Sequence, residues 1–360
     1  MKVVTRFFLL FSLVAALVEL PAKSTSSAGS FSGAIAIDAA TGDVLAEEGA
    51  DVVNPPASMT KLMTFAVLHD KLADGSLTLQ TVVQVDASDA NMGGTQVYLD
   101  PRESFTVEDL IYAMMIQSAN DAAHALARTA AGSVPAFVEL MNAKARALGL
   151  TRTQFRSPHG LPPPSRRVDE GDLSTPRDFA VLCRYLVQNT DVLKYTSVRE
   201  RAFATSRPKG PVMMINHNKL LGKVAGVDGL KTGYTASAGY CLSATAERNG
   251  RRVIVVIMGA FGPGRSVDKG RYRDLKAIEF LDRGFATLPR NLGASPSTAP
   301  ATNTGLPAAP RSAPTRPGAT TVEAIPTVKT ETAPAAAAST SNDFNVTFRV
   351  TPPAPTPKKK

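Results

Sequence analysis

The sequence predicts an α+β fold, or a mixed sandwich with a helical insert, for a body that spans residues 29–290. Two strand-like segments, 34–38 and 44–47, lie near the start of this body, and two more, 240–246 and 252–258, lie near its end. The sequence between them carries helical patterns. Because the strands gather at the two ends and do not alternate with helices, repeated β-α-β units are not expected.

Both strand pairs are joined by residues that favour tight turns. Thr41-Gly42-Asp43 separates the first two segments, and Asn249-Gly250 separates the last two. Asn-Gly favours a two-residue hairpin, because both residues tolerate positive φ angles. We therefore expect antiparallel strands.

Helices are expected where apolar residues recur every three to four positions, or where helix-end signals occur. Thr106 and Asp109 resemble a capping box, Pro135 fits the first turn of a helix that Gly149 ends, and Thr175-Pro176 begins another. The expected helices cover about 59–72, 106–117, 135–149, a segment from 176 that carries Cys183, and 272–285.

The first 28 residues have the pattern of a secretory signal peptide. Lys2 and Arg6 supply a basic start, and Phe7–Val18 is an apolar stretch of 12 residues. A helix that spans a bilayer needs about 20 residues, so this stretch is too short to be a membrane anchor. We therefore expect the mature protein to be exported to the periplasm or cell envelope.

The last segment, residues 291–360, holds 12 of the 26 prolines and ends in three lysines. We expect a disordered basic tail, because this composition cannot bury enough apolar surface to offset chain entropy. The formal net charge is +9, of which residues 1–28 carry +2 and the tail +4, leaving +3 for the body. No basic run in the body indicates nucleic-acid binding. The tail's charge suggests at most weak contact with an anionic wall or membrane surface.

Cysteine and histidine are scarce. Cys183 and Cys241 are the only cysteines, and the chain has four histidines. These counts exclude a disulfide scaffold and an all-cysteine zinc site, and we predict neither metal nor cofactor. Export would expose both thiols to oxidising conditions. A disulfide between Cys183 and Cys241 is therefore an open alternative, although two buried free thiols are the simpler expectation.

A serine and a lysine at the start of the first strong helix form a candidate nucleophile and base. Ser58 and Lys61 are three residues apart, so they share a helix face. Serine needs an adjacent base, and lysine can be that base only if its pKa falls from about 10.4 to near neutrality. Taken alone, Ser58 is better explained as a helix N-cap. The same spacing recurs at 206–209 and 266–269.

Two further motifs change this interpretation. Ser118-Ala119-Asn120 interrupts an apolar helix and is the only Ser-x-Asn, and Lys231-Thr232-Gly233 is the only Lys-Thr-Gly. Separately, the first is explained by a polar helix break and the second by a plain turn before a strand. Together and in this order, the three motifs are typical of penicillin-binding proteins and class A β-lactamases.

With their flanking sequence, these motifs resemble those of the D-alanyl-D-alanine carboxypeptidases, the low-molecular-mass penicillin-binding serine peptidases. The resemblance covers about residues 29–288, and its matching segments are 56–64, 94–96, 158–161, 174–178 and 227–235. It implies a β-lactamase/transpeptidase-like fold: a mainly antiparallel sheet flanked by helices, plus an all-helical region.

The resemblance also implies a reaction. Ser58 would attack the carbonyl between two terminal D-alanines of a peptidoglycan stem peptide, and Lys61 would accept its proton. Ser118 would relay a proton to the leaving amine. A β-lactam antibiotic presents a similar carbonyl and would acylate Ser58. The implied substrate-binding groups are Asn120 for the acyl-side amide, Lys231 and Thr232 for the terminal carboxylate, and the backbone N–H groups of Ser58 and of Tyr234, which follows Gly233, for the oxyanion.

The sequence departs from well-known relatives at two places. Those relatives carry a second, β-rich domain and a terminal amphipathic helix, whereas here the last expected helix leads into the Pro/Ala-rich tail, so membrane anchoring is not expected. Some relatives have an arginine before Lys-Thr-Gly that binds the carboxylate. His217 lies in that region. It either takes the place of this arginine or is a polar loop residue. His159 is expected to be a packed loop histidine.

Three other functions stay open. A D,D-endopeptidase that cuts peptide cross-links would use the same residues. A class A β-lactamase needs a deacylating glutamate between the second and third motifs. Glu170 lies in that interval, but its surroundings do not match. A non-enzymatic protein that binds wall or membrane through its basic tail would not need the intact motifs.

Overall fold

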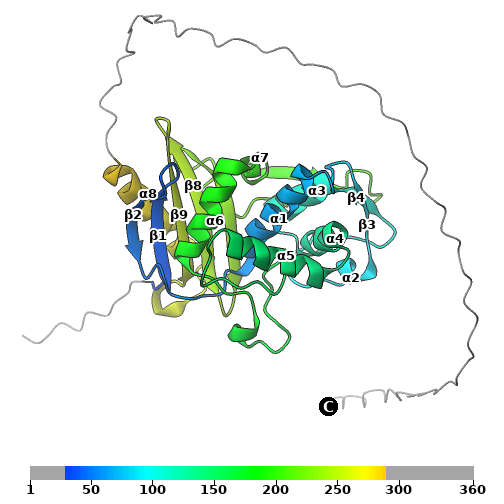
Figure 1. Ribbon diagram of the computed structural model, residues 1–360, viewed down its shortest axis with the longest axis horizontal. Coiled ribbons are helices and arrows are strands. Elements are labelled where there is room, and N and C mark those ends of the chain that lie inside the picture. Colours follow the sequence, from blue (N-terminus) through cyan, green and yellow to red (C-terminus); the bar gives the residue numbers. More distant parts are fainter. Residues whose placement is uncertain (1–28, 289–360) are drawn as a thin grey trace, which may run out of the picture. The chain divides into compact units, whose positions relative to one another are not determined.

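A computed structural model describes residues 29–288; the expected signal peptide and tail lie outside the described residues. The centre is an antiparallel sheet with the strand order β2-β1-β9-β8-β7 (Figure 1). The expected strands from both ends of the body therefore meet in one sheet, which confirms the α+β prediction. The strands are β1 (Gly33–Asp38), β2 (Val44–Glu48), β7 (Val227–Thr235), β8 (Gly239–Arg248) and β9 (Arg251–Ala260).

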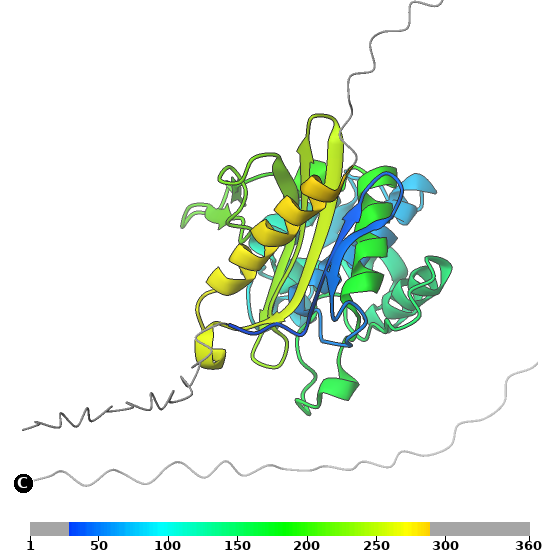
Figure 2. The same cartoon turned by 90° about the vertical axis from the view of Figure 1, so that its left-hand side faces the viewer.

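The sheet is buried on both faces, so β9 reads as a nearly continuous apolar run. Ile35 of β1 pairs with Val256 of β9 and belongs to one core cluster, while Ala36 pairs with Val255 and belongs to the other. Helix α8 (Arg271–Thr287) covers the second face, and α6 (Pro176–Asn189) covers the first together with the helical region (Figure 2).

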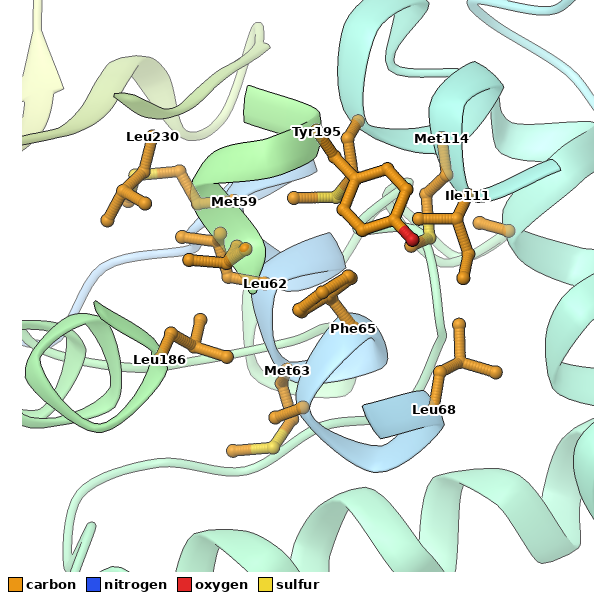
Figure 3. Packing of buried hydrophobic residues seen from close by; sticks show 14 of the residues in the cluster. Met59, Leu62, Met63, Phe65, Leu68, Ile111, Met114, Leu186, Tyr195 and Leu230 are labelled. Carbon is orange, nitrogen blue, oxygen red and sulfur yellow. The ribbon is translucent and has the colours of Figure 1, made fainter. Parts of the chain in front are cut away.

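The helical region surrounds α1 (Lys61–Ala73), whose residues 61–68 are all buried. Figure 3 shows Leu62 and Phe65 projecting from α1 into a cluster that includes Tyr195 of α7 (Val192–Thr196). The rings of Phe65 and Tyr195 have centroids 5.5 Å apart. Close packing on all sides fixes the start of α1. The same region contains α2 (Ala87–Ala90), α3 (Val107–Tyr112), α4 (Asn120–Ala131) and α5 (Val134–Ala147).

The expected helix starts are confirmed by their capping bonds. The Thr106 hydroxyl accepts the N–H of Asp109 at 3.1 Å at the start of α3, and Thr175 accepts that of Asp178 at 3.1 Å at the start of α6. Such bonds pair donors that the first turn of a helix leaves unsatisfied. After α3 the chain continues as a π-helical segment, η2 (Ala113–Gln117), which ends where the sequence predicted.

Several short elements were not expected from the sequence. Strand β3 (Val82–Gln84) pairs with β4 (Ser104–Thr106), and β5 (Glu200–Phe203) pairs with β6 (Val212–Ile215), in two small sheets. Such short strands carry too few residues for a clear alternating pattern. The 3₁₀ segments are η1 (Ala57–Thr60), η3 (Val168–Glu170) and η4 (Pro263–Arg265).

Both cysteines, Cys183 on α6 and Cys241 on β8, are buried free thiols, which agrees with the simpler expectation. Within residues 29–288, no helix has the length and apolar character needed to cross a membrane.

Candidate active site

Ser58 lies in η1, which is held between strand β7 and the loop 157–161. Gly160 and Gly233 make this close approach feasible, because a Cβ atom on either would overlap the backbone of Ala57 or Pro56. Ala57 has a positive φ of 49°, which is uncommon for a residue with a Cβ atom. The backbone nitrogen of Ser58 faces β7 and would lie 3.0 Å from a Cβ on Gly233. The turn and both glycines therefore fix how Ser58 is presented.

Lys61, at the start of α1, is fully buried beside Ser58. Its Nζ lies 3.0 Å from Ser58 Oγ, 2.7 Å from Asn120 Oδ1 and 2.8 Å from the carbonyl oxygen of His159. The last two partners accept hydrogen bonds only. A neutral Lys61 amine therefore uses its two N–H groups on them, and its lone pair points toward the Ser58 hydroxyl.

The surroundings of Lys61 favour this neutral form. Burial lowers the pKa of Lys61 well below its usual value, and the positive charge of Lys231 lowers it further. The carboxylates of Asp172 and Asp121 act in the opposite direction but do not outweigh burial. Lys61 therefore has the geometry and the electrostatics of a general base for Ser58.

A buried carboxylate, Asp172, ties η1 to the loop beneath it. It accepts hydrogen bonds from the hydroxyls of Thr60 and Ser157, both at 2.9 Å, and from the N–H groups of Arg156 and Ser157 at 2.6 and 3.0 Å. Burial nonetheless raises the pKa of Asp172. Sequence reasoning missed this anchor, because its partners lie 15 or more residues away along the chain.

The second motif forms the turn between η2 and α4. Ser118 has a left-handed backbone with a φ of 65° and is buried, so the helix does break here as its polar sequence suggested. Asn120 begins α4, and its Nδ2 donates to the carbonyl of Gly93 at 2.8 Å while its Oδ1 accepts from Lys61. The structure thus brings the first two motifs into direct contact.

The third motif lies inside β7, so its interpretation as a plain turn is wrong. Residues 229–233 are all buried and show no alternation, which removed the period-two signal of a strand. Lys231 Nζ donates to the carbonyl of Thr232 at 3.2 Å. Burial lowers the pKa of Lys231 to about 7, and the charge of Arg273 contributes. Because β7 ends the sheet order, one of its edges faces η1.

A cavity of about 520 Å³ joins the three motifs. Ser58 and Ser118 line it from the helical side, and Thr232, Gly233 and Tyr234 line it from β7. The ring of Tyr234 stacks on Tyr240 with centroids 4.2 Å apart. Sequence reasoning named all five of these motif residues, and it named the segment 216–219, from which Asn216, His217 and Lys219 line the cavity. It missed four further lining residues: Ile215, Tyr240, Lys269 and Arg273.

Arg273 is the most consequential of the missed residues. It reaches the cavity from α8, is buried, pairs with Asp274 at 2.6 Å and donates to the carbonyl of Cys241 at 3.4 Å. A single arginine in a surface helix has no sequence signal that separates it from an ordinary solvated charge. Only the packing of α8 on the sheet brings it to Lys231.

His217, for which the sequence left two roles open, lines the cavity. Its neighbours fix the loop on which it lies. Asn216 donates to the carbonyls of Thr196 and Val198, and Asn218 donates to that of Gly229. The pKa of His217 is lowered to about 4, first by desolvation at the cavity wall and then by Lys231, although part of the side chain stays exposed. These surroundings favour the neutral form of His217.

His159 and Glu170 make contacts that are local to their own loop. His159 Nδ1 accepts the N–H of Leu161 at 3.1 Å, and burial lowers the pKa of His159 to about 3, so it packs in the loop as expected. Glu170 accepts from the Ser165 hydroxyl and pairs with Arg167 at 3.2 Å. Within residues 29–288, no group of acidic, histidine and cysteine side chains forms a candidate metal site.

Known proteins are similar to this chain in both sequence and fold. A model of the D-alanyl-D-alanine carboxypeptidase family matches residues 21–262. D-alanyl-D-alanine carboxypeptidase DacF of Bacillus subtilis is 35% identical over 70% of this chain and 61% of its own length. DacC of Escherichia coli is 40% identical over 63% of this chain and 56% of its own length. The chain thus spans about three fifths of these relatives.

Solved structures agree. The D-alanyl-D-alanine carboxypeptidase DacD from Francisella tularensis matches with a TM-score of 0.64 and 28% identity, covering 70% of each chain. Penicillin-binding protein D2 from Listeria monocytogenes, in its ampicillin-bound form, matches with a TM-score of 0.59 and 32% identity, covering 71% of this chain and 97% of that one. By sequence and by fold, the chain belongs to the D-alanyl-D-alanine carboxypeptidase family.

Proposed function

We propose that this chain is a serine D-Ala-D-Ala carboxypeptidase that removes the terminal D-alanine from peptidoglycan stem peptides. The observation that carries the proposal is the 3.0 Å contact between Ser58 Oγ and Nζ of the buried Lys61. The other two partners of Nζ accept hydrogen bonds only, which favours a lone pair directed at the serine hydroxyl. Membership of the family supports the class of reaction.

The reaction proceeds through an acyl-enzyme. Ser58 gives its proton to Lys61 as Oγ bonds to the substrate carbonyl carbon, and the N–H groups of Ser58 and Tyr234 hold the oxyanion. Losing one such donor typically costs about 10²–10³ in rate. Ser118 relays the proton that Lys61 accepted to the nitrogen of the leaving D-alanine as the C–N bond breaks. Water then cleaves the Ser58 ester and releases the shortened peptide.

Substrate binding falls mainly to the strand side of the cavity. Lys231, Thr232 and Arg273 surround the position of the terminal carboxylate, where positive charge favours an anion. Asn120 has one N–H on Gly93, so its second N–H is available for the acyl-side amide of the peptide. A β-lactam offers the same combination of carbonyl and carboxylate, so we expect it to acylate Ser58.

Covalent labelling with a fluorescent penicillin tests this proposal. The wild-type chain should be labelled, Ser58→Ala should lose the label, and Ser206→Ala should keep it. Ser206 is the matched control, because it begins another Ser-x-x-Lys sequence. D-alanine release from a pentapeptide then identifies the carboxypeptidase. Labelling of folded Ser58→Ala would assign the nucleophile elsewhere and overturn the proposal.

The organisation of the whole chain is part of the proposal. Residues 1–28 act as an export signal, residues 29–290 form the catalytic domain in the periplasm or cell envelope, and residues 291–360 form a basic tail with weak wall or membrane contact. The composition of the two ends supports this. A β-lactamase role has no comparable support, since Glu170 bonds to Ser165 and Arg167.

A further inference from the structure

Ile215, the last residue of β6, gives the catalytic cavity an apolar contact surface. Among the described residues that line this cavity, Ile215 is the only one with a purely aliphatic side chain; the others are polar, charged, aromatic or glycine. Its side chain is 58% exposed. Covering such a surface with methyl or methylene groups of a ligand is favourable, because both lose contact with water. An aliphatic part of the substrate therefore has one favoured position in this cavity.

The apolar surface continues from Ile215 along the same strand. Residues two apart on a strand share a face, so Met213 lies beside Ile215, while Met214 between them points into the core. Met213 is 55% exposed, and pairing with β5 places Ala202 opposite it. Glu200, the charged residue of this face, lies opposite Ile215. The surface is therefore apolar in the direction that leads from Ile215 to Met213, away from Glu200.

Two observations place Ile215 at the end of the cavity where the leaving group departs. Its N–H donates to Gln117 Oε1 at 3.1 Å, and Gln117 directly precedes Ser118. In the other direction the chain continues to His217, which lines the cavity as Arg273 does. In the proposed reaction the leaving nitrogen takes its proton from Ser118, and the terminal carboxylate binds near Arg273. The side chain of the leaving residue is attached between these two groups, where Ile215 can contact it.

This end of the cavity has room for more than a methyl group. Ile215 also borders a second hollow, with a volume of about 400 Å³, so it is a rim of the cavity and not a closed end. A site that selected alanine by size would need side chains on every side of the methyl group. Here Met213 is open to solvent, and its flexible thioether can adapt to a longer aliphatic group.

We propose that Ile215, with Met213 beside it, is the specificity-determining surface for the side chain of the leaving residue, so that the chain also releases terminal D-residues with longer aliphatic side chains, such as D-leucine. This inference rests on the proposed function, because the same bonds form and break. Ser58 Oγ bonds to the carbonyl carbon, the C–N bond to D-leucine breaks, and its nitrogen takes a proton. Water then hydrolyses the ester, with no further reactant.

Three pentapeptides that differ only in their last residue test this inference. With the wild type, kcat/KM for release of D-leucine should equal or exceed that for D-alanine, and that for glycine should be about twofold to threefold lower than for D-alanine. Ile215→Thr makes the surface more polar but keeps a β-branched residue that suits a strand. In this variant kcat/KM should fall about fivefold for D-leucine, about twofold for D-alanine, and least for glycine.

Val82→Thr is the matched control. Val82 is an exposed β-branched residue of the short strand β3 and does not line the cavity, so its replacement should leave the order of the three substrates as in the wild type. A wild type that releases D-alanine but not D-leucine would overturn the inference alone. So would an Ile215→Thr variant that lowers kcat/KM by one common factor for all three peptides, or not at all. Absence of D-alanine release and of penicillin labelling would overturn the proposed function as well.

Discussion

The two sides of the catalytic cavity each have a buried lysine, and the two lysines differ in their hydrogen bonds. On the helical wall, Lys61 has three hydrogen-bond partners, one of them the candidate nucleophile. On the strand wall, Lys231 has one bond, to the carbonyl of Thr232. Both are buried, and burial lowers the pKa of each. A fully bonded amine suits proton transfer, whereas a sparsely bonded one still has donors for a ligand.

The largest effect is expected from changing the helical wall. In Lys61→Arg the side chain stays charged at any usable pH, so it cannot accept the Ser58 proton. The acylation rate with fluorescent penicillin, measured by stopped flow, should fall about 10²–10⁴-fold. Lys144→Arg is the control, because Lys144 of α5 pairs with Asp70 of α1 and does not line the catalytic cavity. A near-wild-type rate in Lys61→Arg would remove Lys61 as the base.

The anchor beneath that wall should affect stability. Asp172→Asn places an amide N–H group among four donors, so urea unfolding should show a loss of about 2–4 kcal/mol in the free energy of unfolding. Glu170→Gln, two residues away and exposed, should stay within about 0.5 kcal/mol of the wild type. Equal stability of the two variants would mean that the carboxylate does not hold η1 in place.

Lys231, on the strand side of the cavity, should determine the alkaline limb of the pH profile of kcat/KM. Lys231 has a pKa lowered to about 7, so the free enzyme loses this charge as the pH rises through that value. For a carboxylate substrate, kcat/KM should then fall by up to about tenfold per pH unit. Lys61 acts oppositely, because it must lose its proton to work. In Arg273→Gln the falling limb should move to higher pH. A profile that stays flat from pH 7 to 9 contradicts this.

The smallest effect is expected at His217. With its pKa lowered to about 4, His217 favours the neutral form, which offers a substrate carboxylate a single N–H donor. His217→Ala should therefore lower kcat/KM for a pentapeptide about twofold to fivefold. His217→Arg, which introduces a positive charge at that position, should raise kcat/KM. No change in either variant would make His217 a simple loop residue.

The sequence predicted contacts that are local and missed those made by distant packing. Ser58 and Lys61 are three residues apart in one helical start, so their contact follows from helix geometry. Lys61 and Asn120 are 59 residues apart. Their meeting was expected only because the motifs resemble those of a known family.

The features that the sequence did not predict have specific physical causes. Strand β7 is buried on both sides at its middle, so the alternation that marks a strand is lost. Ser118 is recognisable as a helix break, but neither its left-handed backbone nor the π-helical segment before it has a sequence signature. Asp172 and Arg273 become part of the site through the packing of a loop and of α8, which spacing along the chain does not encode.

The position of β7 at the end of the sheet also limits the shape of any peptide that binds. A substrate beside this strand would add a temporary sixth strand and exchange main-chain hydrogen bonds with it. Such pairing requires an extended backbone with unmodified amide groups. Peptides whose main chain is bent, or whose amide nitrogens are methylated next to the cleavage point, should therefore be excluded before the chemistry of Ser58 begins.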